Sequence, residues 1–214
     1  MASPSPDPAT WLERAREGHA SLTQLRSAAE SCRACPLYAR ATQTVFGDGP
    51  PRARVLLVGE QPGNEEDKDG RPFVGPAGKL LDRALAAAGL DRRKVYVTNA
   101  VKHFKWTARG KWRIHAKPSP NEVRACKFWL EAEIQAVAPH VVVCLGATAA
   151  QALLGPAFRV TAQRGERIAS PLAPVVTATV HPSSVLRAPD PAVRRRELGL
   201  LVGDLRKVVA MARF

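Results

Sequence analysis

The sequence has few acidic residues and no long apolar segment. Its 214 residues include 19 Asp and Glu against 32 Lys and Arg, a formal net charge of +13. No apolar run reaches the ~18 residues that a membrane-spanning helix needs. Residues 1–10 lack the basic and apolar parts of a secretion signal. We therefore expect a cytoplasmic protein without a membrane segment, with a disordered tail over residues 1–10.

The shortage of acidic residues limits the choice of partner. So large an excess of positive charge adds self-repulsion, and binding to a polyanion is the usual reason for a protein to tolerate it. Nucleic acid is the first candidate. An anionic membrane surface is the alternative, but no basic amphipathic helix with a strong apolar face stands out. An Arg-rich proteome would also produce such a charge without any polyanion.

The distribution of apolar residues indicates one globular domain over residues 11–214, since 45% of the chain is hydrophobic. Short β-branched runs occupy 55–58, 95–98, 141–145 and 175–180. Helical patterns cover 76–88, 120–137, 147–154 and 191–210. Buried strands that alternate with helices predict an α/β fold of three layers, with a central, mostly parallel four-stranded sheet between helices.

Polar residues follow the predicted strands. In parallel sheets, ligands bind beyond the carboxyl ends of the strands. These ends carry 59–63, Asn99, Gly146 and 181–184, which we expect to converge on one cleft. A carboxylate placed there, such as that of Glu60, is suited to orienting a partner or a water molecule. We also expect His103, His115 and His181 on the cleft side, and the acidic run 65–67 to form a metal site or a solvated turn.

The chain has only four cysteines. Cys32 and Cys35 have the spacing C-x2-C, and Cys126 and Cys144 follow with seventeen residues between them. A basic cytosolic protein is not expected to use structural disulfides. The more specific hypothesis is that the four thiolates bind zinc or an iron–sulfur cluster. The alternative is that Cys126 and Cys144 are ordinary buried thiols.

A basic and aromatic segment covers residues 102–117, with the sequence KHFKWTARGKWRIHAK. It holds six Lys or Arg, two Trp and two His, but no acid. Such a composition suits the backbone of a nucleic acid and the stacking of its bases. We expect a loop that turns at 109–111 and overhangs the cleft near Asn99. The alternative is a solvated loop whose Trp side chains pack on the core.

The motifs, in their order, resemble those of the uracil-DNA glycosylase superfamily, in its iron–sulfur branch of family four and its relatives. They are C-R-A-C-P-L, G-E-Q-P-G-N-E-E-D, R-P-F-V-G-P-A-G, T-N-A-V-K-H-F-K, A-C-K-F-W-L, V-V-V-C-L-G-A-T-A and V-H-P-S-S, which extend roughly from Cys32 to Arg206. The resemblance implies a DNA-repair enzyme acting on uracil-containing DNA. It also implies a structural 4Fe-4S iron–sulfur cluster bound by Cys32, Cys35, Cys126 and Cys144.

Two features resemble the narrower UdgX group: G-E-Q-P-G, and a loop that ends R-I-H-A-K-P-S. In that group a loop histidine captures the sugar after uracil leaves. The resemblance makes His115 the nucleophile and Glu60 the group that orients its ring. The family loop usually has a basic residue where this chain has Trp112. The alternatives are a conventional glycosylase with turnover, and a binding or redox-sensing protein without catalysis.

The resemblance also assigns the residues that handle the base. Phe73 stacks on the flipped uracil, Asn99 pairs with its edge, and His181 hydrogen-bonds the developing oxyanion. Gln61 contributes its backbone, and its side chain as well, near the uracil carbonyl. The further expected contacts to uracil or DNA are Gly63, Asp67, Ser183, Ser184 and Arg187. The expected partner is single-stranded uracil-containing DNA, and the expected state is a monomer.

Overall fold

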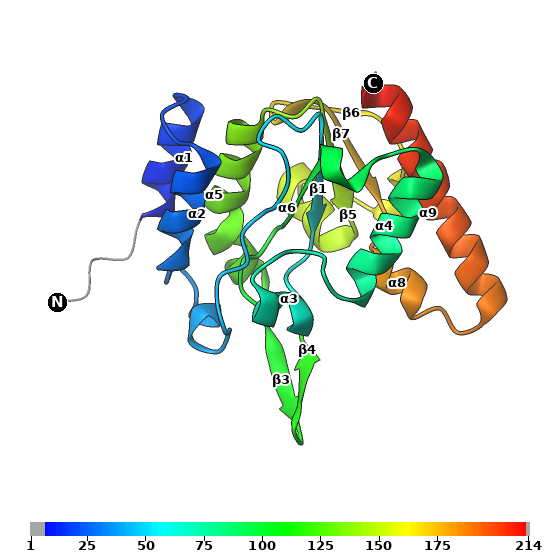
Figure 1. Ribbon diagram of the computed structural model, residues 1–214, viewed down its shortest axis with the longest axis horizontal. Helices are drawn as coiled ribbons and strands as arrows, with labels where there is room; N and C mark the ends of the chain where they lie inside the picture. The colour runs from blue at the N-terminus through cyan, green and yellow to red at the C-terminus, as the bar shows by residue number, and fades with distance from the viewer. Residues whose placement is uncertain (1–6, 213–214) are drawn as a thin grey trace.

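The structure, a computed structural model, describes residues 7–212 and contains a twisted central sheet (Figure 1). The strand order is β2-β1-β5-β7-β6. The four parallel strands are β1 (Val55–Gly59), β2 (Val95–Asn99), β5 (Val141–Leu145) and β7 (Ala173–Thr179). The mostly parallel α/β fold is confirmed. The four parallel strands lie where the apolar runs predicted them.

The predicted number of strands is wrong by one. A fifth strand, β6 (Ile168–Ser170), pairs antiparallel with β7 at the edge of the sheet. It has only three residues and is not fully buried, so it has no continuous apolar run. Its strand conformation comes from pairing with β7 rather than from local preference.

Helices cover both faces of the sheet (Figure 1). On one face lie α4 (Pro76–Ala88), α8 (Pro182–Leu186) and α9 (Pro191–Ala212). On the other lie α5 (Pro120–Val137), α6 (Ala147–Leu154) and α7 (Val160–Gln163). The helices α1 (Pro8–Arg16) and α2 (Leu22–Glu30) pack on the outer side of α5. Short 3-10 turns occupy Pro36–Ala39 and Arg92–Lys94.

The amino-terminal helix begins earlier than expected. Asp7 caps α1 by accepting a 3.0 Å hydrogen bond from the backbone N–H of Ala9, and Pro8 takes the first helical position. Residues 8–10 of the predicted tail are therefore helical, while residues 1–6 of it lie outside the described residues. None of the helices within residues 7–212 has the length and apolar character needed to cross a membrane.

The basic and aromatic segment forms a hairpin rather than a loop. The strands β3 (Trp106–Arg109) and β4 (Trp112–His115) pair antiparallel and turn at Gly110, whose φ is 57°. The hairpin projects from the edge of the molecule near α3 (Asn64–Asp69) (Figure 1). Residues directly opposite in a hairpin share a face, so Trp106 and His115 lie on the same side of it.

A fully buried ion pair supports the end of β2. The Lys102 ammonium contacts a carboxylate oxygen of Glu133 on α5, and it also donates to Thr98 Oγ1 at 2.7 Å and to the Asn99 carbonyl at 2.8 Å. The other oxygen of Glu133 accepts from the Gly47 N–H at 2.8 Å. Both charges are satisfied, and the network holds the backbone at Asn99, the last residue of β2.

Replacing Glu133 by Gln should lower the free energy of unfolding by about 3–5 kcal/mol, because the Lys102 charge would stay buried without its counterion. Urea denaturation measures the change. Glu131→Gln on the same helix is the matched control. The partners of Glu131, Arg16 and Lys127, are substantially exposed. The control variant should therefore lower the free energy of unfolding by less than about 1 kcal/mol. Equal losses in the two variants would contradict a special role for the buried pair.

Candidate active site

A cavity of about 900 Å³ opens at the carboxyl edge of the parallel strands. The residues that follow each strand line it: Glu60 after β1, Asn99 at the end of β2, Gly146 after β5 and His181 after β7. His115 of the hairpin lines the same cavity. The strand ends expected to converge therefore do so. The cavity also receives a side chain from the projecting hairpin.

Phe73 and Asn99 form an apolar and amide-lined part of this cavity, and both are buried. A Cβ on Gly59 would lie 2.7 Å from the Phe73 ring and would also collide with the Asn99 amide oxygen. Only glycine leaves room here for both side chains. Phe73 has a φ of 60°, the left-handed region that costs a non-glycine residue energy. Its ring lies 6.1 Å from that of His181.

The hydrogen bonds of His181 define which nitrogen carries the proton. Its Nδ1 accepts from the backbone N–H of Ser183 at 3.1 Å and lies 2.8 Å from the Ser183 hydroxyl. Burial, reinforced by the positive charge of Arg187 and by His115, lowers the pKa of His181 to about 4. The ring is therefore neutral at pH 7 with its proton on Nε2. Such a ring is a hydrogen-bond donor that carries no charge of its own.

Glu60 and His115 are neighbours at the mouth of the cavity. His115 Nε2 lies 3.4 Å from Glu60 Oε1, with side chains that are 49% and 24% exposed. The second carboxylate oxygen, Glu60 Oε2, accepts a hydrogen bond from the Thr148 hydroxyl. The pair joins a base or orienting group to a potential nucleophile, and both remain accessible to a bound molecule.

Gln61 connects the body to the base of the hairpin. Its Oε1 accepts from the Lys105 N–H at 3.0 Å, while its Nε2 donates to the carbonyls of Ala116 at 3.0 Å and Lys105 at 3.2 Å. The Nε2 also lies 2.9 Å from His115 Nε2. The amide of this side chain is therefore engaged by the hairpin in the structure, and its contact with uracil stays a prediction. Gln61 still lines the cavity.

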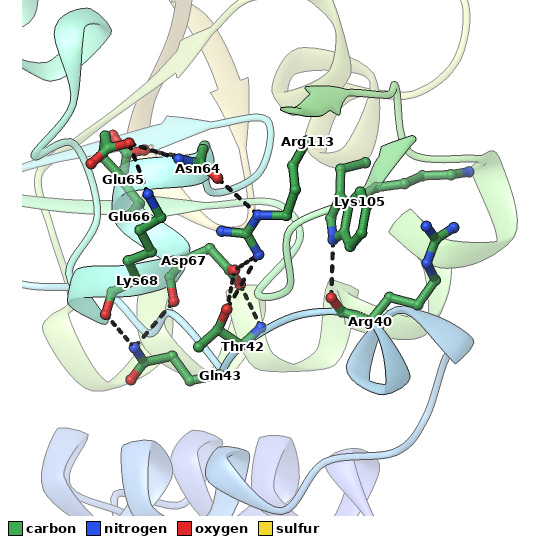
Figure 2. Close-up of polar contacts among 12 residues, drawn as sticks. Arg40, Thr42, Gln43, Asn64, Glu65, Glu66, Asp67, Lys68, Lys105 and Arg113 are labelled. Atoms are coloured by element: carbon green, nitrogen blue, oxygen red, sulfur yellow. Dashed lines mark hydrogen bonds and ion pairs between the residues drawn. The ribbon is translucent and has the colours of Figure 1, made fainter. Parts of the chain in front are cut away.

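A buried ion pair fixes the hairpin to α3 (Figure 2). Arg113, two residues before His115, donates to Asp67 Oδ2 at 2.6 Å and to Asn64 Oδ1 at 2.8 Å. Asp67 also accepts from the Thr42 backbone at 2.9 Å. Asp67 is fully buried and is not among the residues that line the cavity, and its contact with uracil or DNA stays a prediction. Its carboxylate holds the strand that carries His115.

The remaining predicted contacts divide between the cavity and its supports. Gly63, Ser183, Ser184 and Arg187 all line the cavity. Ser183 directs its hydroxyl to His181, and Ser184 donates to the His181 carbonyl at 2.7 Å, so both support that residue. His103 is buried beside Thr44, with 2.9 Å between Nε2 and Oγ1, and is absent from the cavity lining.

Comparison with known proteins places this architecture in a family. A model described as the uracil DNA glycosylase superfamily matches residues 46–199. The chain belongs to this superfamily. Among its relatives, a type-4 uracil-DNA glycosylase of Thermotoga maritima is 41% identical over 167 residues, which cover 78% of this chain and 83% of that protein.

Two further relatives have the same description. A type-4 uracil-DNA glycosylase of Archaeoglobus fulgidus is 45% identical over 121 residues, covering 56% of this chain and 57% of that protein. A type-4 uracil-DNA glycosylase of Pyrobaculum aerophilum is 35% identical over 176 residues, which cover 78% of this chain and 86% of that protein. The superfamily match contains every cavity residue described above, including Glu60, His115 and His181.

The cysteines do not form the four-ligand site that the superfamily's iron–sulfur branch implied. Cys32, Cys35 and Cys126 belong to the apolar cluster of α1, α2 and α5. Burial raises the pKa of Cys126 to about 12, and the neighbouring Cys35 and Cys32 add to the rise. Cys144 lies in the middle of β5, in the sheet core. Burial alone raises its pKa, also to about 12.

The predicted set therefore does not fit a cluster with four cysteine ligands. Within residues 7–212, no three or more Cys, His, Asp or Glu side chains are grouped as around one metal ion. The same search leaves the acidic run 65–67 without a metal site: Asp67 binds Arg113, and Glu66 accepts hydrogen bonds from the Gly63 and Gly75 N–H groups.

Sequence reasoning missed Thr148 and the Lys102–Glu133 pair. Thr148 lies two residues after Gly146 and lines the cavity. Ligands bind beyond the carboxyl ends of parallel strands, and the first turn of a helix that follows such a strand lies at the same edge of the sheet. Including that first turn in the prediction would have found Thr148. The Lys102–Glu133 pair gave no such signal, because the two residues are 31 positions apart in the chain.

The neutral state of His181 can be measured by NMR titration of its ring protons. We expect a midpoint near 4, against about 6.5 for an exposed histidine. Because the folded pKa lies below the unfolded one, the contribution of His181 to stability is complete above about pH 6.5 and decreases as the pH falls toward 4. A His181→Asn variant identifies the signal. A midpoint at 6 or above would contradict the neutral donor.

Proposed function

We propose that this protein excises uracil from DNA and retains the resulting abasic sugar as a covalent adduct on His115. The observation that carries the proposal is the Glu60–His115 pair, with 3.4 Å between Oε1 and Nε2, at the mouth of a cavity that also contains Asn99 and His181. The superfamily match and the type-4 relatives support uracil in DNA as the substrate.

Recognition requires a base that has left the helix stack or comes from a single strand. Phe73 offers a ring face in the cavity, and Asn99 offers a side-chain amide beside it. An amide carries both a donor and an acceptor, so it can pair with the O4 and N3–H of uracil. Cytosine presents the opposite pattern at those atoms. Asn99 therefore provides selectivity, and the Lys102 contact to its backbone supports its position.

Bond cleavage separates charge. The electron pair of the glycosidic bond leaves with uracil, which becomes an anion, while the sugar gains oxocarbenium character. A neutral His181 with its proton on Nε2 is suited to donate to the developing uracil oxyanion.

Capture follows when the lone pair of one His115 ring nitrogen attacks C1′ of the sugar. The ring then bears a positive charge, which it loses by releasing the proton on its other nitrogen to the Glu60 carboxylate. The uracil anion takes up a proton from solvent, so atoms and charges balance. The alkylated, neutral imidazole is a poor leaving group, and the protein stops after one turnover.

A conventional glycosylase with turnover is the second candidate. It is favoured by the exposure of Glu60, which leaves 24% of its side chain open to solvent and could activate a water molecule instead. In that case His115 would contribute to binding only. The two candidates predict different products and are separated by a single assay.

We also propose that the protein acts as a monomer on single-stranded DNA, and that the hairpin contacts that DNA. The face of β4 that points away from the body carries Trp112, 66% exposed, and Ile114, 44% exposed. Lys111 lies over the Trp112 ring, 5.6 Å from its centroid. An exposed aromatic ring among cations can stack on an unpaired base next to the flipped nucleotide.

An iron–sulfur cofactor is proposed on the family resemblance and on the place of Cys32, Cys35 and Cys126 in one apolar cluster, that of α1, α2 and α5. Cys126 Sγ accepts from the Lys102 N–H, and Cys32 Sγ from the Trp129 indole N–H, each at 3.2 Å. Donors of this kind stabilise cluster thiolates. We propose that Cys32, Cys35 and Cys126 are ligands of a structural cluster and that Cys144 is not.

The proposed function is tested by mixing the protein with a labelled uracil-containing single-stranded oligonucleotide and separating the products on a denaturing gel. We expect a shifted band that resists hot detergent and is missing with a thymine control. Strand breakage after alkali without a shifted band would replace covalent capture by conventional turnover. The absence of both signals would contradict glycosylase activity.

Replacing His115 by Ala should abolish the shifted band while uracil is still released, since capture and bond cleavage use different groups. Release is followed by alkaline strand breakage at the abasic site. His140→Ala is the matched control, because His140 lines a separate cavity at the opposite edge of the sheet. A band that persists in His115→Ala would assign the nucleophile to another residue.

Replacing Cys126 by Ser should remove the visible charge-transfer absorbance and the bound iron of the purified protein, whereas Cys144→Ser should keep both. Absorbance spectra and iron analysis measure the two quantities. Loss of iron in Cys144→Ser with a retained fold would return Cys144 to the ligand set. A colourless wild-type protein with stoichiometric zinc would refute the proposal that the protein binds an iron–sulfur cluster.

A further inference from the structure

The two carboxylate oxygens of Glu60 have different partners. Oε1 faces His115 Nε2 at 3.4 Å. Oε2 accepts a hydrogen bond from the Thr148 hydroxyl on the other side of the carboxylate. A carboxylate held at one oxygen cannot rotate freely about its last bond, so the direction of the oxygen that faces His115 depends on Thr148.

Thr148 is placed for this contact by the fold. It is the second residue of α6, which begins directly after β5 and Gly146. The side chain is buried, with 8% of the residue exposed, so its hydroxyl has a fixed environment. Gly146 permits the close approach, since a Cβ there would lie 3.0 Å from the His181 Cβ. The G-A-T segment thus contacts both His181 and Glu60.

We propose that Thr148 is a positioning residue for covalent capture: its hydroxyl orients the Glu60 carboxylate toward His115. This inference rests on the proposed function. Thr148 does not itself need to touch the sugar or the base. Its effect reaches the reaction through Glu60, which must lie beside the imidazole to accept its proton when the ring attacks C1′.

Other charges around the cavity make this orientation necessary. Lys117 and Arg187 line the same cavity as Glu60. A carboxylate free to turn could pair with either cation, and it would then leave the His115 ring without a proton acceptor. A neutral hydroxyl holds the carboxylate without competing for the proton, because a threonine hydroxyl does not ionise near neutral pH.

The test compares Thr148→Val, which keeps the shape of the side chain but removes the hydroxyl, with Thr148→Ser, which keeps the hydroxyl. Single-turnover adduct formation on uracil-containing DNA is measured for both variants and the wild type. We expect Thr148→Val to slow capture by about tenfold or more, as for the loss of a hydrogen bond to a charged group, and Thr148→Ser to stay within about threefold of the wild type. Unfolding curves establish that both variants are folded.

A second pair of variants separates positioning from a general loss of structure. In the His115→Ala background, uracil release should proceed at the same rate with Thr148 and with Thr148→Val, because the capture step, which Thr148 supports through Glu60, no longer takes place. Equal slowing of release there would overturn the proposal, and so would wild-type capture by Thr148→Val or a Thr148→Ser variant as slow as Thr148→Val. A wild type that forms no adduct would instead refute the proposed function, and the positioning role with it.

Discussion

The position of His115 depends on one buried ion pair. The residue lies on a hairpin that projects from the body of the molecule, and a two-stranded hairpin alone is only marginally stable in water. Arg113 anchors it by its 2.6 Å contact with Asp67, which is itself held by the Thr42 backbone at 2.9 Å. Removing either charge would leave the other partly or fully buried without a partner. The hairpin would then lose its fixed relation to the cavity.

The ion pair joins two parts of the site that have separate physical origins. The parallel sheet brings Glu60, Asn99 and His181 to one edge, since the carboxyl ends of parallel strands lie together. The hairpin adds His115, with Gln61 linking its two ends. In the proposed function, the sheet edge would serve recognition and bond cleavage, and the hairpin would supply the nucleophile for capture.

Electrostatics within the site differ from those of the surface. The surface carries the net charge of +13, which favours any nucleic acid. Inside the cavity, His181 is kept neutral by burial and by Arg187, so it can donate a hydrogen bond without attracting the phosphate backbone. The Lys102 charge is cancelled by Glu133. The cavity therefore contains a neutral histidine donor within a protein of high net positive charge.

Sequence patterns predicted the parallel strands and the main helices well, because continuous apolar runs and helical stripes reflect burial directly. The α4 stripe of Leu80, Leu81, Ala84 and Leu85 is one such case. Features that depend on residues far apart in the chain could not be predicted from local sequence patterns. The strand β6 forms through its pairing with β7, and the hairpin is anchored by Arg113 and Asp67, which lie far apart in the chain.

The candidate site shows the same division. Strand-end residues such as Glu60, Asn99 and His181 could be located from topology. The resemblance assigned Asp67 and the Gln61 side chain to uracil or DNA, but a motif does not reveal which way a side chain turns, and in the structure both bind the hairpin. The family resemblance implied that Cys144 is a cluster ligand, yet its place in the middle of β5 surrounds it with apolar side chains. The direction and depth of a side chain are three-dimensional properties that the motifs could not predict for these three residues.

The most direct test of covalent capture is to digest the protein after reaction with uracil-containing DNA and to locate the attached sugar by tandem mass spectrometry. If His115 captures the sugar, the peptide that contains His115 should carry a deoxyribose-derived mass, with fragment ions assigning it to that ring. An unmodified His115 peptide together with free abasic DNA, or a modification on any other residue, would contradict capture by His115.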